Sequence, residues 1–337
     1  MLAINPVAFT IFGKDIYWYG IIIALAMVAG ALIVRQMFRR NHLDPDWVTD
    51  LALLVIPLAI IGARVHYVLW SWEEFAGRPF WNVFAIWNGG LAIWGGIIGG
   101  LIGAAIFSAW RKVPVLTLTD SLLPGLALGQ AIGRWGNFIN QEVYGKVVQN
   151  DLFKVFPLAV LIERTGECHW ALFFYESVAN LIIFALLFFL VSKKTKVKGV
   201  TTLCYFIFYG VVRAVLEPLR DTAYIQNING VPVNMIVSIL FAIGGTVALV
   251  LLLESDRAKR LAAQRAAEEE AEAVEDAAAE EEAEEAAEET EVPEAASADE
   301  TAESAQGQEE ADTAGITGEV PEETPEEAPE TKEESHE

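Results

Sequence analysis

Cysteine, histidine and positive charge are scarce in this chain. Its 337 residues include 2 cysteines, 4 histidines and 23 lysines and arginines, against 46 acidic residues. The one place where cysteine and histidine adjoin, "ECH" at 167–169, is too small a set of ligands to hold a metal ion. We therefore expect no metal site and no cofactor, and we expect no nucleic-acid partner.

Negative charge is confined to the end of the chain. Residues 254–337 contain 32 acidic and 5 basic residues, whereas residues 1–253 contain 14 acidic and 18 basic ones. The acidic segment has no apolar face, and after about residue 290 it gathers Pro, Thr, Gly and Ser. Such a composition buries too little surface to offset chain entropy. We predict a mostly disordered tail over 254–337, whose first part has the composition of a solvated Ala/Glu helix.

Long apolar runs fill residues 1–253. A helix needs about 20 apolar residues to cross roughly 30 Å of hydrocarbon. The runs predict an all-α, polytopic integral membrane protein with about seven transmembrane helices, at 16–37, 50–72, 83–109, 117–138, 171–191, 200–218 and 232–253. Only Lys14 and Asp15 are charged ahead of the first run, so we expect that run to be retained rather than cleaved as a secretory leader.

Lysine and arginine gather after alternate spans. They follow the first, third, fifth and seventh runs: Arg35, Arg39, Arg40, Arg111, Lys112, Lys193, Lys194, Lys196, Lys198, Arg257, Lys259 and Arg260. The positive-inside bias makes this side cytoplasmic, which predicts an outward N-terminus and a cytoplasmic C-terminus. Cys168 then lies outside the membrane and Cys204 near the inner face, so we expect no disulfide between them.

Polar side chains inside the spans fall at one depth, towards the outside. An ionisable group in hydrocarbon costs at least about 3 kcal/mol unless it is paired or lines a wet cavity. Six spans supply such residues: Tyr19, Arg64, Asn88, Arg134, Asn137, Asn140, Glu176, Arg213 and Glu217. Guanidinium groups bind anionic oxygens through several donors. We predict an outward-facing polar cavity that suits an anionic lipid headgroup.

Arg213 and Glu217 are four residues apart and share a helix face. Their pairing has two interpretations, mutual neutralisation or an arginine held by Glu217 at a phosphate site, and both stay open. Two sets of glycines also matter. Gly95, Gly99 and Gly103, at four-residue spacing, predict close helix packing. Gly133 and Gly136 are expected to interrupt a helix beside Arg134.

The segment "GRWGNFINQEVYG" at 133–145 resembles the signature of the prolipoprotein diacylglyceryl transferase family, close to G-R-x-G-N-F-x-N-x-E. Further family-like segments follow in the family's order: "WYG" at 18–20, "GAR" at 62–64, "WNGGLAIWGG" at 87–96, "LFFYE" at 172–176 and "YGVVRAVLEPLRD" at 209–221. The resemblance covers nearly all of residues 16–253 and implies seven spans with an outward N-terminus. The acidic tail lies outside it.

The resemblance implies a transferase reaction. The diacylglyceryl group of phosphatidylglycerol would move to the lipobox cysteine thiol of a preprolipoprotein, forming a thioether and releasing glycerol phosphate. The partners would be phosphatidylglycerol and preprolipoprotein signal peptides. The enzyme would sit in the bacterial cytoplasmic membrane with its active site towards the outer leaflet.

The resemblance also implies site residues. Those with catalytic roles are Tyr19, Arg134, Asn137, Asn140, Glu142, Arg213 and Glu217. Gly145 carries over as well, and we expect Arg134, Arg213 and Gly145 to bind phosphatidylglycerol. From their position and chemistry, rather than from the resemblance, we add Arg64, Asn88 and Arg220 to this binding set, with His169 and Glu176 as further candidates. From residue chemistry, Arg134 and Arg213 would hold the phosphate, Asn137 and Asn140 would donate to headgroup oxygens, and Glu142 and Glu217 would orient the arginines. Arg220 would attract anionic lipid or the signal-peptide end.

One departure affects the general base. Trp94 stands where several family members have histidine, and an indole cannot accept a proton at neutral pH. His169, a carboxylate or solvent remain as alternatives. The main rival function is a lipid flippase or transporter for anionic lipids, and a second is a lipid-binding scaffold without catalysis. The single depth of the polar residues and the lack of an internal repeat weigh against a transporter.

Overall fold

The computed structural model describes residues 5–225, 227–228 and 231–290. Seven of its helical stretches are long and apolar enough to cross a membrane, which confirms an all-α, polytopic membrane protein. The elements are β1 (Val7–Ile11), β2 (Lys14–Tyr17), α1 (Trp18–Arg40), α2 (Trp47–Trp70), α3 (Trp72–Phe75), η1 (Phe80–Phe84), η2 (Ile86–Asn88), α4 (Ile93–Arg111), α5 (Val115–Ile139), η3 (Asp151–Phe153), β3 (Ala159–Ile162), β4 (Glu167–Trp170), α6 (Leu172–Ala185), a π-helical turn η4 (Leu186–Val191), α7 (Ser192–Lys194), α8 (Val200–Leu216), η5 (Glu217–Leu219), η6 (Thr222–Tyr224), β5 (Asn227–Ile228), β6 (Val231–Pro232) and α9 (Val233–Thr290).

The third span starts later than predicted. We expected it over 83–109, but α4 begins at Ile93, and the residues before it form the short turns η1 and η2. Gly89 and Gly90 have φ of 85° and 78°, a left-handed conformation that ends a right-handed helix. The other spans begin within a few residues of the predicted positions.

Glycine allows the backbones of α2 and α4 to touch. A Cβ atom added at Gly99 would collide with the carbonyl oxygen of Leu58, and one at Gly62 would collide with the carbonyl oxygen of Gly95. The close packing predicted from the glycine spacing is therefore confirmed. Within lipid, this close packing joins the two helices through van der Waals contact, without a hydrophobic driving force.

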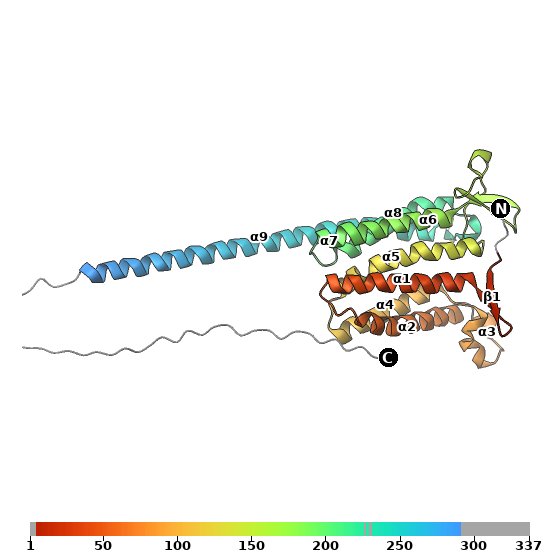
Figure 1. Cartoon of the computed structure of the whole chain (residues 1–337), viewed down its shortest axis with the longest axis horizontal. Helices are drawn as coiled ribbons and strands as arrows, with labels where there is room; N and C mark the ends of the chain where they lie inside the picture. The colour runs from red at the N-terminus through yellow and green to blue at the C-terminus, as the bar shows by residue number, and fades with distance from the viewer. Residues whose placement is uncertain (1–4, 226, 229–230, 291–337) are drawn as a thin grey trace, which may run out of the picture. The chain divides into compact units, whose positions relative to one another are not determined.

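Helix α5 packs against α1 and α6, and this arrangement positions the polar residues (Figure 1). Gly30 of α1 and Gly125 of α5 meet backbone to backbone. On the α6 side, Ser177 donates a hydrogen bond to the carbonyl oxygen of Ala131 over 2.7 Å and receives one from the Trp135 indole over 3.1 Å. These contacts set the C-terminal half of α5 beside the N-terminal half of α6.

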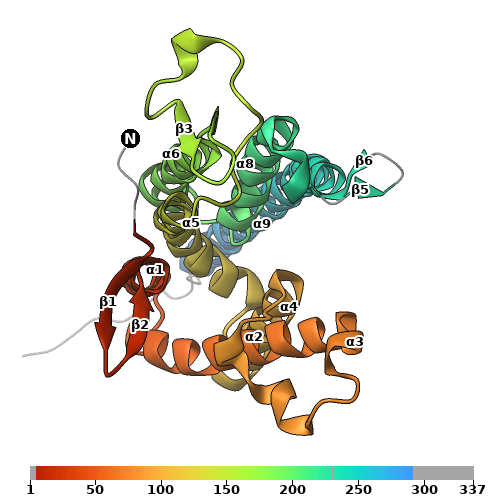
Figure 2. The same ribbon diagram turned by 90° about the vertical axis from the view of Figure 1, so that its right-hand side faces the viewer.

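Short strands and turns cover one end of the helices. The hairpin β1–β2 precedes α1, and the hairpin β3–β4 connects α5 to α6 (Figure 2). Tyr144, Val160, Ile162, Ala171 and Phe173 form a buried apolar cluster beneath β3 and β4. This outer layer holds the chain segment that follows α5, which contains the end of the signature motif.

Helix α9 continues beyond the seventh span. We expected residues 254–337 to be mostly disordered, but the structure describes 254–290 as helical. Alanine and glutamate have high helix propensity, and the preceding span supplies the nucleus that an isolated helix lacks. Residues 291–337 lie outside the described residues, so the expectation for them stays untested.

Candidate active site

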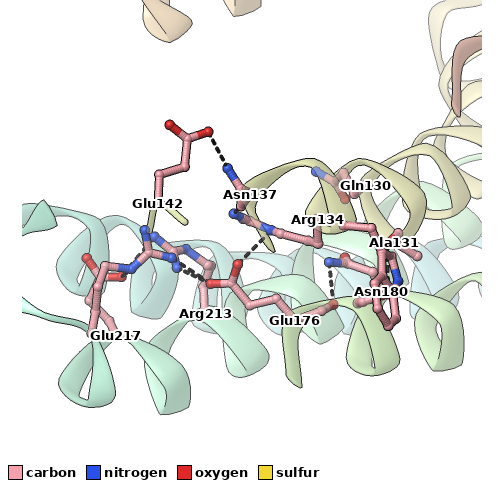
Figure 3. A network of polar contacts seen from close by, with 12 residues as sticks. Gln130, Ala131, Arg134, Asn137, Glu142, Glu176, Asn180, Arg213 and Glu217 are labelled. Atoms are coloured by element: carbon pink, nitrogen blue, oxygen red, sulfur yellow. Dashed lines mark hydrogen bonds and ion pairs between the residues drawn. The ribbon is translucent and has the colours of Figure 1, made fainter. Parts of the chain in front are cut away.

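One buried carboxylate, that of Glu176, forms ion pairs with three arginines. Glu176 is 2% exposed, and its Oε2 lies 2.6 Å from the Nε of Arg134. Its Oε1 accepts from Arg213 over 2.8 Å and from Arg220 over 2.6 Å. Figure 3 shows the Arg134 and Arg213 side chains meeting this carboxylate. Glu176 was only a further candidate in the sequence, yet it is the centre of the network.

Glu217 supplies the second carboxylate of the network. Its Oε2 lies 2.8 Å from Arg213 and 3.4 Å from Arg220, and its Oε1 accepts from Asn234 of α9 over 3.3 Å. Burial lowers the pKa of Arg220. The Glu176 carboxylate acts in the opposite direction, and the neighbouring arginines lower this pKa further. Three guanidinium groups thus face two carboxylates, which leaves an excess of positive charge.

The helix positions explain why these residues meet. Glu176 lies in the second turn of α6, Arg134 in the last turns of α5, and Arg213 in the last turn of α8. Since α6 runs in the opposite direction to α5 and α8, the beginning of one and the ends of the others lie at the same depth. We name Arg134, Glu176, Arg213, Glu217 and Arg220 the arginine cluster.

A second chain of polar contacts leaves Arg134 in another direction. Arg134 donates to Asn137 over 3.4 Å, and Asn137 donates to Glu142 over 3.0 Å. Asn140 also donates to Glu142, over 3.4 Å. Glu142 was predicted to orient the arginines, but in the described structure its hydrogen bonds go to the two asparagines. It reaches the cluster only through Asn137 (Figure 3).

The backbone around Glu142 is strained. Gln141 and Val143, its two neighbours, have φ of 48° and 55°. This left-handed region is disfavoured for a β-branched residue such as valine. Strain of this kind clusters at functional sites, where the surrounding structure holds it in place. It positions the Glu142 carboxylate just beyond the end of α5.

Helix α5 is not interrupted at the signature glycines. The prediction of a break at Gly133 and Gly136 was wrong, since the helix runs through both to Ile139. Gly136 instead makes room for Tyr19, because a Cβ atom there would lie 2.6 Å from Cδ2 of the Tyr19 ring. The Tyr19 ring at the start of α1 therefore packs on Gly136, within the segment that carries Arg134 and Asn137.

His169 and Gly145 hold the outer layer together. His169 is 2% exposed, and its ring nitrogens lie 2.8 Å from the carbonyl oxygen of Gly145 and 3.2 Å from the Thr165 hydroxyl. A Cβ atom at Gly145 would come within 2.8 Å of both Trp170 and Leu219. Both ring nitrogens of His169 thus have partners, which favours the interfacial hydrogen-bonding role over that of a base.

Arg64 lies elsewhere. Its guanidinium donates to the backbone carbonyl groups of Asn82, Val83, Gly89 and Gly90 over 2.7–2.9 Å. The Arg64 guanidinium therefore holds the turns before α4 in place. Among the described contacts, none joins it to the arginine cluster. The side chain of Asn88 lies outside the described residues. Trp94, at the start of α4, is 40% exposed.

Two polar residues one helical turn deeper, Gln130 and Asn180, were not among the predicted site residues. Gln130 precedes Arg134 by four residues, and Asn180 follows Glu176 by four, so each shares a face with its cluster partner. Gln130 accepts from the Tyr205 hydroxyl over 3.1 Å, and Asn180 donates to the carbonyl oxygen of Glu176 over 2.8 Å. The four-residue spacing was the available signal.

An open apolar cavity of about 520 Å³ lies at the helix ends that carry Tyr19 and Arg134. Residues of α1 and α5 line it: Trp18, Ile22, Trp135, Phe138 and Ile139. Trp18 and Trp135 are the chain neighbours of Tyr19 and Arg134. Polar donors and an apolar space large enough for part of an acyl chain therefore lie on the same helix ends.

Comparison with known proteins identifies the family. A family model described as prolipoprotein diacylglyceryl transferase matches residues 6–251. The phosphatidylglycerol–prolipoprotein diacylglyceryl transferase of Oceanobacillus iheyensis is 40% identical over 232 residues, which cover 67% of this chain and 80% of that protein. The enzyme of Finegoldia magna is 37% identical over 244 residues, which cover 72% and 94% of the two chains. This chain belongs to the prolipoprotein diacylglyceryl transferase family.

Proposed function

We propose that this chain transfers the diacylglyceryl group of phosphatidylglycerol to the lipobox cysteine of preprolipoproteins. The observation that carries the proposal is the arginine cluster, in which Arg134, Arg213 and Arg220 meet on one buried carboxylate at the ends of three spans. An anionic phosphodiester at this depth finds paired donors and a positive excess. This reaction agrees with the activity named for the family relatives.

Arg134 is the arginine that would touch the phosphate. Its side chain is 22% exposed, against 11% for Arg213 and 7% for Arg220. Its Nε is held by Glu176, so terminal N–H donors remain for phosphate oxygens. Arg213 and Arg220 would act as fixed positive charges behind it. Asn137 and Asn140 supply amide donors for the headgroup.

The transfer needs a thiolate and a stabilised leaving group. The cysteine sulfur forms a bond to the terminal glyceryl carbon, and the bond from that carbon to the phosphate oxygen breaks. Glycerol phosphate leaves with one more negative charge on its phosphate, which donors placed in advance stabilise most effectively. The positive cluster also favours the thiolate form of the substrate cysteine.

Glu142 is our candidate acceptor for the thiol proton. Among the described ion pairs, none joins Glu142 to an arginine, in contrast to Glu176 and Glu217. It lies beside Asn137 and close in sequence to Arg134, and it is half-buried. A carboxylate in this position can accept the proton without a histidine. The apolar cavity beside Trp135 would hold part of an acyl chain.

The deciding experiment is a direct transfer assay. Purified protein is incubated with phosphatidylglycerol vesicles and a peptide that contains a lipobox cysteine, and the peptide mass is measured. A diacylglyceryl adduct and released glycerol phosphate support the proposal. Movement of labelled phosphatidylglycerol between leaflets without any adduct would instead support a flippase.

We also place the arginine cluster towards the outer leaflet of the bacterial cytoplasmic membrane. The basic residues that follow alternate spans support this orientation. The variant Glu163→Cys, in a chain with Cys168→Ser and Cys204→Ser, tests it, because Glu163 is exposed in the turn between β3 and β4. A membrane-impermeant maleimide should label this cysteine in intact cells. Labelling only after the cells are opened would reverse the orientation.

A further inference from the structure

A second cavity lies at the opposite ends of the helices from the arginine cluster. It has a volume of about 600 Å³, and its lining includes Leu190, Val191, Lys194, Lys196, Cys204 and Arg260. Glu176 lies near the beginning of α6, whereas Leu190 and Lys194 follow its end, and Arg213 lies near the end of α8, whereas Cys204 lies near its beginning. The cavity is therefore separate from the proposed active site.

Buried polar contacts hold one wall of this cavity. The π-helical turn η4 carries Leu190 and Val191, and its Phe188 carbonyl oxygen accepts from Arg40 of α1 over 2.6 Å. The Arg40 guanidinium also lies 3.9 Å from the centre of the Phe188 ring. A π-helical turn inside an α-helix often marks a functional position. Here Arg40 of α1 holds the π-helical turn in place.

A buried carboxylate holds the opposite wall. Asp120 of α5 is 7% exposed and accepts from the backbone N–H groups of Gly199 and Thr202 over 2.6 and 2.8 Å, and from the Thr202 hydroxyl over 2.7 Å. Asp120 thereby caps the N-terminus of α8, which satisfies N–H groups that would otherwise lack partners. The cavity between η4 and α8 is thus a built feature of the fold.

The lining contains both charged and apolar side chains. Lys194, Lys196 and Arg260 provide three cations, and Arg260 is also paired with Asp256 over 2.7 Å. Leu190, Val191 and Val200 provide the apolar part. A ligand that fits must carry an anionic group next to a hydrocarbon chain. Lysines at helix ends in a membrane protein also attract the phosphates of anionic lipids.

We propose that this cavity binds an anionic phospholipid from the leaflet at this end of the spans. Its phosphate pairs with Lys194, Lys196 and Arg260, and the upper part of one acyl chain packs on Leu190 and Val191. The lipid stays bound as a structural ligand between η4, α8 and α9. The site needs no transfer chemistry, so it can be tested independently of the reaction.

Cys204 provides a probe inside the cavity. In the variant Cys168→Ser it is the one remaining cysteine, and its reaction with a maleimide is followed in nanodiscs. The nanodiscs contain phosphatidylcholine alone or an equal mixture with phosphatidylglycerol. We expect phosphatidylglycerol to slow the labelling roughly tenfold when its concentration is about ten times its dissociation constant. Soluble glycerol phosphate, which lacks the acyl chains, should give no protection.

A charge-matched pair of variants makes the test specific. In Lys194→Gln/Lys196→Gln/Arg260→Gln the protection should disappear. In Lys193→Gln/Lys198→Gln/Lys259→Gln, which removes the same charge from residues outside the lining, the protection should remain. Native mass spectrometry of the same proteins gives a second readout, because the first variant should retain one anionic lipid fewer. Equal labelling in both nanodiscs with equal lipid retention, or equal protection by glycerol phosphate, overturns the proposal.

Discussion

Glu176 determines where three arginines point. It is 2% exposed and contacts Arg134, Arg213 and Arg220 at 2.6–2.8 Å. Removing one partner from a buried ion pair leaves the other charge unpaired in a medium of low polarity, which costs more than the pair itself contributes. A carboxylate on one helix thus sets the direction of guanidinium groups from three other segments, α5, α8 and the residue that follows η5.

The variant Glu176→Gln should therefore lose both stability and activity. We expect a loss of about 3–5 kcal/mol in the free energy of unfolding and a fall in transfer rate on the order of 10²-fold. Thermal unfolding in detergent and the peptide mass assay measure the two effects. Glu167→Gln is the matched control, since Glu167 is exposed on β4. Wild-type behaviour of Glu176→Gln would remove Glu176 from the centre of the site.

Arg134 and His169 should differ sharply. Arg134→Ala leaves the developing phosphate charge unmatched, and we expect transfer to fall on the order of 10²–10³-fold while membrane insertion continues. His169→Ala should keep measurable transfer, because both histidine nitrogens already serve the outer layer. Its cost should appear as about 1–3 kcal/mol of stability, from an unsatisfied Gly145 carbonyl group.

The comparison is made at matched expression, with peptide mass as the readout. A His169→Ala enzyme as inactive as Arg134→Ala, and restored by added imidazole, would show that the histidine is the base. A Glu142→Gln variant completes the set. If Glu142 accepts the thiol proton, this variant should regain rate when the pH is raised and the substrate thiol ionises in solution.

Among the helices, the contact between α2 and α4 depends on the absence of side chains. Gly99 faces the backbone of Leu58 and Ala59, whereas Gly100, on the same helix, has its nearest neighbour at 3.9 Å from an added Cβ atom. Both residues are glycines within the same helix, so replacing each by alanine changes helix propensity equally. A comparison of the two substitutions therefore separates the effect of packing from that of the backbone. Arg64 of α2 also donates hydrogen bonds to carbonyl oxygens of the turns that precede α4.

The variant Gly99→Ala should destabilise the protein by about 1–3 kcal/mol, because the helices must move apart to admit the methyl group. Gly100→Ala should be neutral or stabilise by up to about 1 kcal/mol, since alanine favours the helix. Unfolding in detergent, followed by circular dichroism, measures both. Equal effects of the two substitutions would show that helix contact at Gly99 does not matter.

Across the whole chain, the part that matches the family and the acidic segment occupy different residues. The family model ends at residue 251, and the contacts of the chain divide after Glu270. All residues of the arginine cluster and of both cavities precede Arg265. Among the described residues, those of 266–290 therefore have no part in the site.

A chain that stops after Arg265 should keep membrane insertion and near-normal transfer. The reason is that the truncation leaves every span and every contact of the site in place. Transfer per mole of inserted protein is the measurement, with the full chain as reference. Abolished transfer in a correctly inserted truncation would give the acidic segment a catalytic role.

The seven spans and the gathering of polar residues at one end of them follow from the sequence by itself. Each is a local property, because hydropathy is read over about 20 neighbouring residues and an uncompensated charge in hydrocarbon costs too much to be accidental. The family signature is local as well. Arg134, Arg213 and Glu217 could be selected on these grounds alone.

Only the tertiary structure decided which side chains meet. Glu176, Arg134 and Arg213 lie on three helices, and their contacts depend on how far each helix is shifted and rotated against the next. The same holds for Arg64, whose carbonyl partners come from turns that hydropathy merges with the third span. Spacing along a chain shows which residues share a helix face, but ion pairing falls off within a few ångströms, and distances between helices are set by packing.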